Sequence, residues 1–271
     1  MLKKIIRFAA AVAGASAVYA VMLYLLQDRL LFVPDYAYVS PSAAGLEEFA
    51  ENPIKAADGS RVMGWYAKGK AEKPLVLFFH GNARQVAFFA PYLKPYLKEG
   101  YSVLMPEYRG FAGNAGYLSE ENMYGDAEAW FDYAKNVLKH DRIVVMGYSM
   151  GTAPASRLAG TRSPEAVVLM APFYSLLREV KDKNIPLAAK LLTRRLESYK
   201  YIAAYGGALL IVHGQKDRLI AARHGKDLFE LSPSGQKNFL LFEDANHHML
   251  FFKNKYHRFV LQWLKKLSAD N

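Results

Sequence analysis

Residues 142–151 read RIVVMGYSMG, and this stretch decides the fold. An apolar run typical of a buried strand ends in the pentapeptide GYSMG (147–151), and a helix-forming stretch continues to residue 158. A G-x-S-x-G pattern between a strand and a helix predicts a sharp turn that holds Ser149 in strained backbone geometry. Glycines on either side of that serine avoid clashes with neighbouring elements. The serine hydroxyl then lies at a helix N-terminus, where free N–H groups stabilise developing negative charge.

Short apolar runs alternate with helix-forming stretches along the rest of the chain. The predicted strands are residues 61–67, 75–79, 102–105, 143–146, 166–170, 209–212 and 238–242. The predicted helices are residues 85–99, 119–138, 150–158, 224–231 and 255–267. Continuously apolar strands are typical of burial on both faces, and their alternation with helices is typical of a parallel sheet. The sequence therefore predicts an α/β fold, with a doubly wound, mostly parallel sheet and helices on both faces.

One connection is longer than the others. Residues 172–206, which are rich in Leu, Lys and Arg, separate two predicted strands. Insertions of this kind leave a doubly wound sheet at the carboxyl ends of its strands, where ligands bind. We expect a small helical cap over the site, and two ordinary crossover helices are the alternative.

An acid and a histidine follow Ser149 in chain order. Asp217 comes just after the strand predicted at 209–212, and His247 comes just after the strand at 238–242. Both side chains should therefore emerge at the same edge of the sheet as Ser149. A histidine there accepts the serine proton through one ring nitrogen, while the acid orients the other. The predicted catalytic triad is Ser149, Asp217 and His247, and the alternative for Asp217 is a turn-forming role alone.

Two backbone N–H groups are expected to stabilise an oxyanion near Ser149. One belongs to Met150, directly after the serine. The other belongs to Asn82, in the loop His80-Gly81-Asn82 that follows the predicted strand 75–79. Gly81 permits a tight backbone there, and a plain turn is the alternative.

The other histidines have different expected roles. Structural roles are expected for the two at strand ends, His80 and His213. Surface or helix positions are expected for His140, His224 and His257. His248, next to His247, is the alternative base. Only one of the two can serve, because adjacent side chains on an extended loop point in different directions.

Composition narrows the class of protein further. The chain has 271 residues, of which 52% are apolar and 22% charged, and these values suit one large globular domain with decorations. It contains no cysteine, which excludes disulfides, thiolate zinc sites and cysteine nucleophiles. The net charge is +10, without a basic block interleaved with aromatics, so no nucleic-acid partner is expected. The charge suits acidic lipid headgroups, or solubility alone.

The N-terminal segment has the length of a membrane span. Nineteen uncharged residues, FAAAVAGASAVYAVMLYLL (8–26), follow Lys3, Lys4 and Arg7. As a helix they extend about 28 Å, close to the hydrocarbon thickness of a bilayer. The basic residues indicate a cytoplasmic N-terminus, with the large domain on the opposite side, which is the periplasm in a bacterium.

We therefore predict three regions: a membrane anchor over residues 1–27, a connecting segment over 28–52, and a catalytic domain over 53–271. Two alternatives to the anchor remain. One is a cleaved signal peptide, for which Ala13, Ala15 and Ala17 supply small residues. The other is a buried helix of a soluble domain, against which the lack of a polar face argues.

Several of these stretches together resemble a known superfamily. The elbow GYSMG, the loop FFHGNA, the segments PEYRGFAGNAG and LLIVHGQKD and the terminal histidine loop resemble the α/β-hydrolase superfamily over nearly the whole chain. More narrowly, the chain resembles the Bem46-like (ABHD13-type) branch, whose members often carry an N-terminal anchor followed by a segment like QDRLLFVP. The resemblance matches His247 with the family's histidine. Glu107 stands where the family more often has aspartate, in a segment that braces the fold.

The triad and the resemblance imply a serine hydrolase, a carboxylesterase or thioesterase that transfers an acyl group to water. The anchor and the apolar insertion suggest acylated or lipid-like substrates. Neither a metal nor a cofactor is expected. One alternative is a serine peptidase or amidase, which the same triad serves, and another is a catalytically silent, membrane-tethered binding module.

Overall fold

The sheet has antiparallel pairing at one edge and parallel pairing from there to the opposite edge. The computed structural model describes residues 1–269. Within them the sheet has eight strands, in the order β1-β2-β4-β3-β5-β6-β7-β8. The bounds are β1 Ala50–Lys55, β2 Arg61–Ala67, β3 Leu75–Phe79, β4 Ser102–Pro106, β5 Ile143–Tyr148, β6 Ala166–Met170, β7 Ala208–Gly214 and β8 Lys237–Phe242. β1 and β2 pair antiparallel, and all neighbours from β4 to β8 are parallel.

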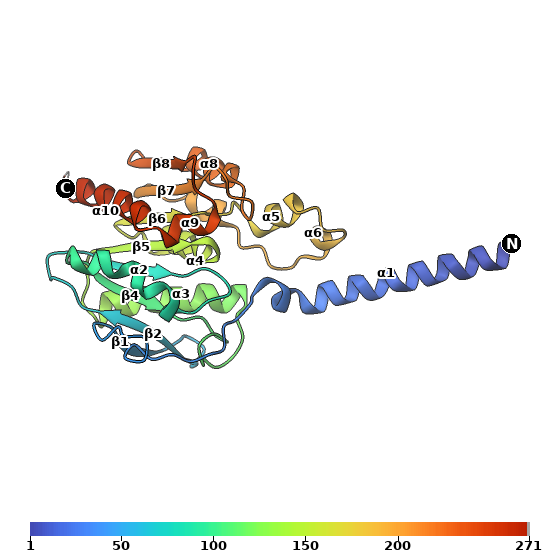
Figure 1. The fold of residues 1–271 in the computed structure, drawn as a ribbon, viewed down its shortest axis with the longest axis horizontal. Helices are drawn as coiled ribbons and strands as arrows, with labels where there is room; N and C mark the ends of the chain where they lie inside the picture. Colours follow the sequence, from blue (N-terminus) through green and yellow to red (C-terminus); the bar gives the residue numbers. More distant parts are fainter. Residues whose placement is uncertain (270–271) are drawn as a thin grey trace.

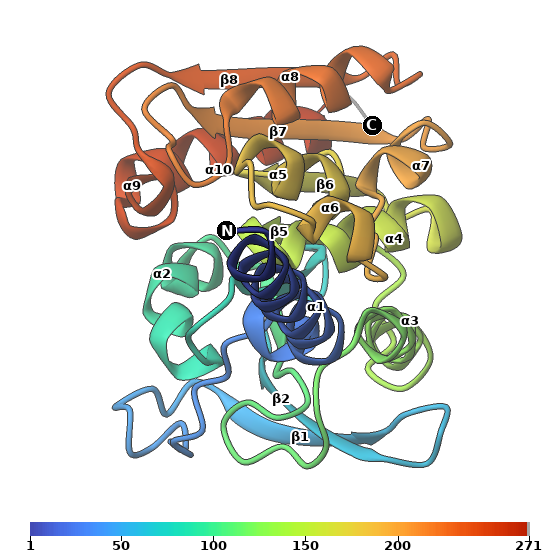
Figure 2. The ribbon, with the colours of Figure 1, turned by 90° about the vertical axis from the view of Figure 1, so that its right-hand side faces the viewer.

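Helices cover both faces of this sheet (Figure 2). Their bounds are α1 Leu2–Leu31, α2 Val86–Lys98, α3 Glu120–Asn136, α4 Thr152–Arg162, α5 Leu176–Asp182, α6 Ala188–Leu191, α7 Ser198–Ile202, α8 Ala222–Leu231, α9 His247–Phe252 and α10 Asn254–Ala269. α2, α9 and α10 share one hydrophobic core with one face of the sheet. α3, α4, α7 and α8 share a second core with the other face.

The central strand β3 shows why its sequence is apolar throughout. Leu75, Leu77 and Phe79 belong to the core under α3 and α4, whereas Val76 and Phe78 belong to the core under α2 and α10. Because successive side chains alternate between faces, a strand with helices on both sides has no position for a polar residue. All five side chains are buried.

The predicted α/β fold with a mostly parallel sheet is confirmed, and the differences are local. The structure adds strand β1, which begins at Ala50 inside the expected connecting segment. It also adds the short helix α9, because the side chain of Asn246 caps the amide of Met249. His224 and His257 lie on helices, which is one of the two positions expected for them, and both side chains are fully buried.

Helix α1 is continuous from Leu2 to Leu31, and most of it projects away from the rest of the chain (Figure 1). Residues 1–19 are exposed along their whole length. Within residues 1–269, α1 is the one helix long and apolar enough to cross a membrane, with a mean hydropathy of 1.9 over its best window. It extends four residues past the boundary expected at residue 27.

The base of α1 is fastened to the segment that follows α6. Gln27 accepts hydrogen bonds from the amide and the hydroxyl of Thr193, at 2.9 and 2.8 Å. Asp28 forms a two-pronged ion pair with the guanidinium of Arg194, with both N–O distances at 2.7 Å. Planar pairs of this kind fix orientation as well as distance, so the body determines the direction in which α1 leaves it.

The expected cap, residues 172–206, folds as α5, α6 and α7. α7 packs against α4 on the body of the domain. α5 and α6 instead extend toward α1, where α6 contacts α1 and α5 packs against α6 (Figure 1). The insertion is therefore divided between a part that supports the sheet and a part that flanks the N-terminal helix.

The buried histidine on α10 should make stability depend on pH. His257 Nε2 donates to the carbonyl of Phe251 at 2.7 Å, and its Nδ1 accepts from Tyr96 Oη at 3.1 Å. Burial lowers the pKa of His257 to about 4, against the opposing effect of the Phe251 hydrogen bond. Unfolded histidine titrates near pH 6.5, so the unfolded chain alone takes up a proton between about pH 6.5 and 4. Stability should fall by about 3 kcal/mol across that window.

In His257→Gln this loss should disappear, although the variant is less stable at neutral pH. Thermal unfolding of the detergent-solubilised full chain at a series of pH values measures the difference. His248→Gln, at an exposed histidine nearby, is the control and should keep the wild-type pH dependence. Equal slopes for His257→Gln and wild type would contradict the assignment.

Candidate active site

The turn between β5 and α4 has strained and unusually close backbone packing. Ser149 opens a one-turn 3-10 helix with φ of 52°, a conformation that side-chain-bearing residues rarely adopt. A Cβ on Gly147 would lie 2.3 Å from the carbonyl oxygen of Gly151. A Cβ on Gly151 would lie 2.1 Å from the carbonyl oxygen of Phe79 in β3. Both glycines are therefore required by contact, as the sequence pattern predicts.

The structure brings the three predicted triad residues together. His247 Nε2 lies 2.9 Å from Ser149 Oγ, and His247 Nδ1 lies 2.7 Å from Asp217 Oδ2. Ser149 follows β5, Asp217 follows β7 and His247 follows β8, so all three emerge at the carboxyl ends of parallel strands. This linear relay can move a proton from the serine hydroxyl to the imidazole and stabilise the resulting imidazolium.

Asp217 is held by more than the histidine. Its Oδ1 accepts the amides of Leu219 and Ile220 at 2.9 and 2.8 Å. Burial by itself would raise the pKa of the Asp217 carboxyl. Hydrogen bonds from His213 and His247, together with the electrostatic effect of His247 and the Ile220 amide, reverse this effect and hold the pKa well below its usual range. The carboxylate is thus a fixed negative charge beside the imidazole.

His247 and His248 point into different surroundings. His247 is 6% exposed, and Tyr148 Oη donates to its carbonyl oxygen at 3.2 Å. His248 is exposed, and its ring lies roughly parallel to that of Phe252, with centroids 6.3 Å apart. The geometry of a general base therefore belongs to His247, while His248 stands at the rim of the site.

The loop after β3 is held in place by buried hydrogen bonds of His80 and Glu107. The two ring nitrogens of His80 face oxygen atoms, with Nε2 2.9 Å from Glu107 Oε1 and Nδ1 2.7 Å from the carbonyl oxygen of Gly81. Glu107 also accepts the amides of Val86 and Tyr108, at 2.8 and 3.1 Å. One glutamate thus links the loop to the start of α2. This is the bracing role expected for the segment around Glu107.

The side chain of Asn82 points toward helix α1. Its Nδ2 donates to the carbonyl of Leu31 at 2.7 Å, and its Oδ1 accepts the amide of Val33 at 2.9 Å. The side chain of Asn82 therefore satisfies backbone groups at and just beyond the end of α1. Met150 is buried in the first turn after Ser149. The oxyanion roles of Asn82 and Met150 remain predictions.

A cavity of about 430 Å³ opens beside the serine. It is lined by Asn82, Ala83, Arg84, Phe88, Phe89, Tyr148, Ser149, Leu219, His247, His248 and Phe252. The aromatic residues of α2 and α9 make one wall apolar, which suits an acyl chain. Residues 172–206, all within the described part of the chain, contribute no lining residue. The sequence did not predict Leu219, Phe88 or Phe252, because only the fold brings these apolar side chains to Ser149.

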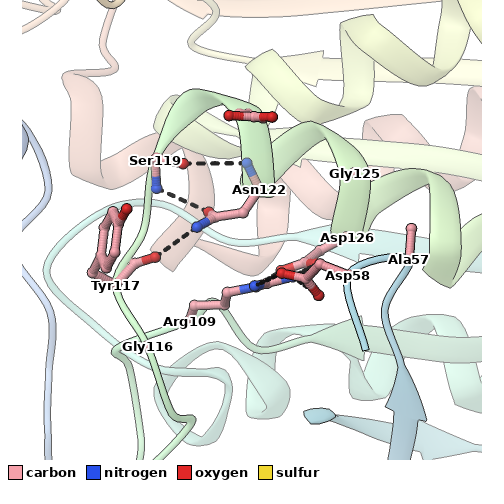
Figure 3. A pocket seen from close by; sticks show the side chains of 10 residues that line it. Ala57, Asp58, Arg109, Gly116, Tyr117, Ser119, Asn122, Gly125 and Asp126 are labelled. Carbon is pink, nitrogen blue, oxygen red and sulfur yellow. Dashed lines mark hydrogen bonds and ion pairs between the residues drawn. The ribbon is translucent and has the colours of Figure 1, made fainter. Parts of the chain in front are cut away.

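A second cavity, of about 420 Å³, has the features of a structural brace (Figure 3). Arg109 lies between two carboxylates, with bonds of 2.5–3.1 Å to Asp58 and 2.6–2.7 Å to Asp126. Ser119 and Asn122 form a reciprocal cap at the start of α3. The guanidinium of Arg109 is thus paired with two carboxylates, and Ser119 is paired with Asn122, which indicates a structural role for these four contacts.

The arrangement nearest to a metal site is formed by Glu179, Asp182 and His224. His224 Nδ1 accepts the amide of Tyr174 at 3.1 Å, and its Nε2 lies 2.7 Å from Asp182 Oδ2. The Nδ1 lone pair is used and Nε2 carries the proton, so the ring has no lone pair for an ion. Arg223 also pairs with Asp182, at 2.7 Å. The cluster is an ion-pair network.

Comparisons with known proteins agree with this architecture. The family model described as the alpha/beta hydrolase fold matches residues 74–191. Rv2307c of Mycobacterium tuberculosis, an uncharacterised protein, is 32% identical over 202 residues, which cover 72% of each chain. The chain belongs to the α/β-hydrolase superfamily.

Solved structures share the fold at low identity. An esterase of Pyrococcus furiosus, Pf2001, is 20% identical and has a TM-score of 0.70, with 87% of this chain and 99% of that chain covered. A membrane phospholipase A, described as a bacterial virulence factor, is 16% identical with a TM-score of 0.66. Its alignment covers 97% of this chain and 99% of that chain, so it includes much of α1.

The Asp217 network generates the first test of the site. Asp217→Asn should slow covalent reaction of Ser149 with a fluorophosphonate probe by about a hundredfold or more. An asparagine amide neither stabilises the His247 imidazolium nor holds the neutral His247 ring in the tautomer that can accept the serine proton. The rate of probe incorporation measures this effect. Asp244→Asn, at an exposed aspartate in the loop before α9, is the matched control and should react at the wild-type rate. An unchanged rate for Asp217→Asn in folded protein would remove Asp217 from the triad.

Proposed function

We propose that this α/β hydrolase is a serine hydrolase that cleaves ester or thioester bonds of acylated, lipid-like substrates. The observation that carries the proposal is the relay from Ser149 Oγ through His247 to Asp217, with distances of 2.9 and 2.7 Å. The positive φ of Ser149 supports it, because strained backbone at a nucleophile is typical of functional geometry.

In the proposed reaction, Ser149 Oγ attacks the acyl carbonyl while His247 Nε2 takes the hydroxyl proton. Asp217 stabilises the imidazolium, and the N–H groups of Asn82 and Met150 stabilise the oxyanion. His247 then gives its proton to the departing alcohol or thiol as the carbonyl–leaving-group bond breaks. Water, deprotonated by His247, attacks the acyl-enzyme, and the released Ser149 oxygen recovers a proton from the imidazolium. No metal or cofactor takes part.

The proposal includes anchoring by α1. Its mostly exposed, uncharged residues 8–26 would span the bilayer, with Lys3, Lys4 and Arg7 on the cytoplasmic side. The catalytic domain then lies on the non-cytoplasmic surface, which is the periplasmic surface in a bacterium. The ion pair of Asp28 with Arg194 supports this arrangement, because it fixes the domain just beyond the apolar run.

The position of the loop after β3, which contains Asn82, supports a substrate held in the membrane surface. Asn82 bonds to Leu31, five residues beyond Leu26, and five helical residues rise about 7.5 Å. That distance corresponds to the headgroup layer, where the ester bonds of lipids lie. The apolar wall of the catalytic cavity would accept the acyl chain. The low-identity neighbour that is a membrane phospholipase A is consistent with this substrate class.

Probe labelling tests the proposed nucleophile. A fluorophosphonate should label the purified full chain, and Ser149→Ala should abolish labelling and hydrolysis of ester substrates. A panel of soluble esters, thioesters and peptides then identifies the bond that is cleaved. Ser156→Ala, at a buried serine of α4, is the control and should still be labelled. A folded wild-type protein without labelling would refute the proposed activity, and faster cleavage of peptides would favour an amidase.

The side chain of Asn82 provides a separate test of the oxyanion hole. Asn82→Ala keeps the backbone N–H but removes both bonds to the end of α1, so the loop should lose its fixed position. We expect kcat to fall about tenfold with little change in KM, because a misplaced donor costs stabilisation in the transition state.

Steady-state hydrolysis of a soluble ester gives both constants. Gln85→Ala removes a comparable tether, from Gln85 Nε2 to the carbonyl of Ala37, and should leave kcat nearly unchanged. An equal fall in kcat for the two variants would show that the hydrogen bonds of the Asn82 side chain have no specific role in catalysis.

A further inference from the structure

We propose that the tip of the insertion, residues 185–187, enters the lipid beside α1 as a second membrane contact, in a bilayer that contains anionic lipid. The tip joins α5 to α6 and contains Ile185, Pro186 and Leu187. This inference rests on the proposed anchoring by α1, and it adds a surface to which no function has been given above.

The depth of the tip follows from its contact with α1. Tyr19 Oη lies 3.4 Å from the carbonyl oxygen of Pro186. Tyr19 is seven residues before Leu26, the end of the apolar run, and seven helical residues rise about 10 Å. When residues 8–26 span the hydrocarbon, Pro186 lies about 10 Å below its surface. Interfacial helices bury their apolar faces to a comparable depth of about 5–10 Å.

The tip has the side chains of a lipid-facing surface. Ile185 is 44% exposed and Leu187 is 43% exposed, and Pro186 between them is also exposed. Below the tip, an apolar crevice of about 140 Å³ separates α1 from the insertion. It is lined by Leu23, Gln27, Leu30, Leu31, Val180, Ile185, Ala188, Leu191 and Leu192. Water in contact with this surface would cost free energy that acyl chains would not.

The backbone of the tip is also suited to hydrocarbon, where unpaired polar groups are costly. The carbonyl of Ile185 accepts the amide of Ala188 at 3.3 Å. The carbonyl of Leu187 accepts the amides of Lys190 and Leu191, at 3.0 and 3.1 Å. Pro186 has no N–H to satisfy. With the Tyr19 hydroxyl on Pro186, all three carbonyls of the tip are therefore paired.

Basic residues flank the apolar tip on both sides. Lys181 and Lys190 are exposed, and their chains are long enough to carry the ammonium groups up to the headgroups. Arg195, also exposed, follows closer to the body. An apolar tip with a basic border matches an anionic bilayer surface, because acidic lipid headgroups attract lysine and arginine side chains close to the membrane.

The insertion is also connected to the catalytic cavity. Lys183 Nζ donates to the carbonyls of Arg218 and Leu219, at 3.2 and 2.6 Å. Leu219 lines the cavity beside Ser149. The position of the tip in the membrane is thereby linked to one wall of the site, through a single ammonium group.

Single cysteines can test the contact directly, because the chain contains none of its own. Leu187→Cys in the full chain is labelled with a polarity-sensitive fluorophore and reconstituted in phosphatidylcholine–phosphatidylglycerol vesicles. Val18→Cys, on α1 at the same depth, reports the anchor, and Val137→Cys, an exposed apolar position at the end of α3, reports the body. Fluorophosphonate labelling of Ser149 shows that each variant is folded.

The expected result is a blue-shifted emission for positions 187 and 18, quenched by lipids with a nitroxide on the acyl chain, and an unquenched, water-like emission for position 137. Quenching at 18 without quenching at 187 would overturn the membrane contact of the tip and leave the anchor intact. Absence of quenching at both positions would overturn the proposed anchoring as well.

Polar substitution of the tip gives a functional readout. Ile185→Ser combined with Leu187→Ser should lower the hydrolysis of a vesicle-embedded ester several-fold and leave a soluble short-chain ester unaffected. Val137→Ser is the matched control and should change neither rate. Equal rates on embedded ester for the double variant and wild type would contradict the proposal.

Discussion

The close approach of the β5–α4 turn to β3 is the contact on which the rest of this structure depends. Because Gly147 and Gly151 have no side chains, Gly147 packs directly against the backbone of Gly151, and Gly151 packs directly against the backbone of Phe79 in β3. This packing forces Ser149 into a positive φ and raises its hydroxyl above the sheet edge. The strands β7 and β8 then deliver Asp217 and His247 to the same edge, because they run parallel to β5. The arrangement of Ser149, Asp217 and His247 is thus a consequence of strand direction and of one very tight turn.

Buried polar groups stabilise this edge without taking part in the relay. His80 and Glu107 fix the loop that carries Asn82, and Arg109 ties α3 to the turn before β2 through two carboxylates. Breaking such pairs leaves an uncompensated charge in a low-dielectric interior, which is costly. The substitution of glutamate for the family's usual aspartate at position 107 is accommodated, since Glu107 still reaches His80 and the start of α2.

Hydrogen bonds and ion pairs connect helix α1 with the loop and the insertion next to the cavity beside Ser149. The last turn of α1 and the residues after it are bound by Asn82 of the loop after β3, by Thr193 and by Arg194. The insertion reaches α1 on one side and, through Lys183, the cavity-lining Leu219 on the other. In the proposed arrangement, these contacts hold Ser149 at a fixed height above the membrane. That height would suit the proposed substrates, if their scissile bond lies in the headgroup layer.

The sequence by itself determined the fold class and the order of the site. The continuous apolar runs required strands buried on both faces, and GYSMG required a tight strand-to-helix turn, because only glycine fits positions 147 and 151. Strand β1 was missed because AENPIK has no strong apolar pattern and pairs only at the edge. The tertiary structure alone decided that Asn82 grips the end of α1, that Leu219 lines the cavity, and that the insertion turns toward α1 instead of covering Ser149. Those contacts join residues far apart in the chain, and their partners are selected by packing geometry that no local pattern encodes.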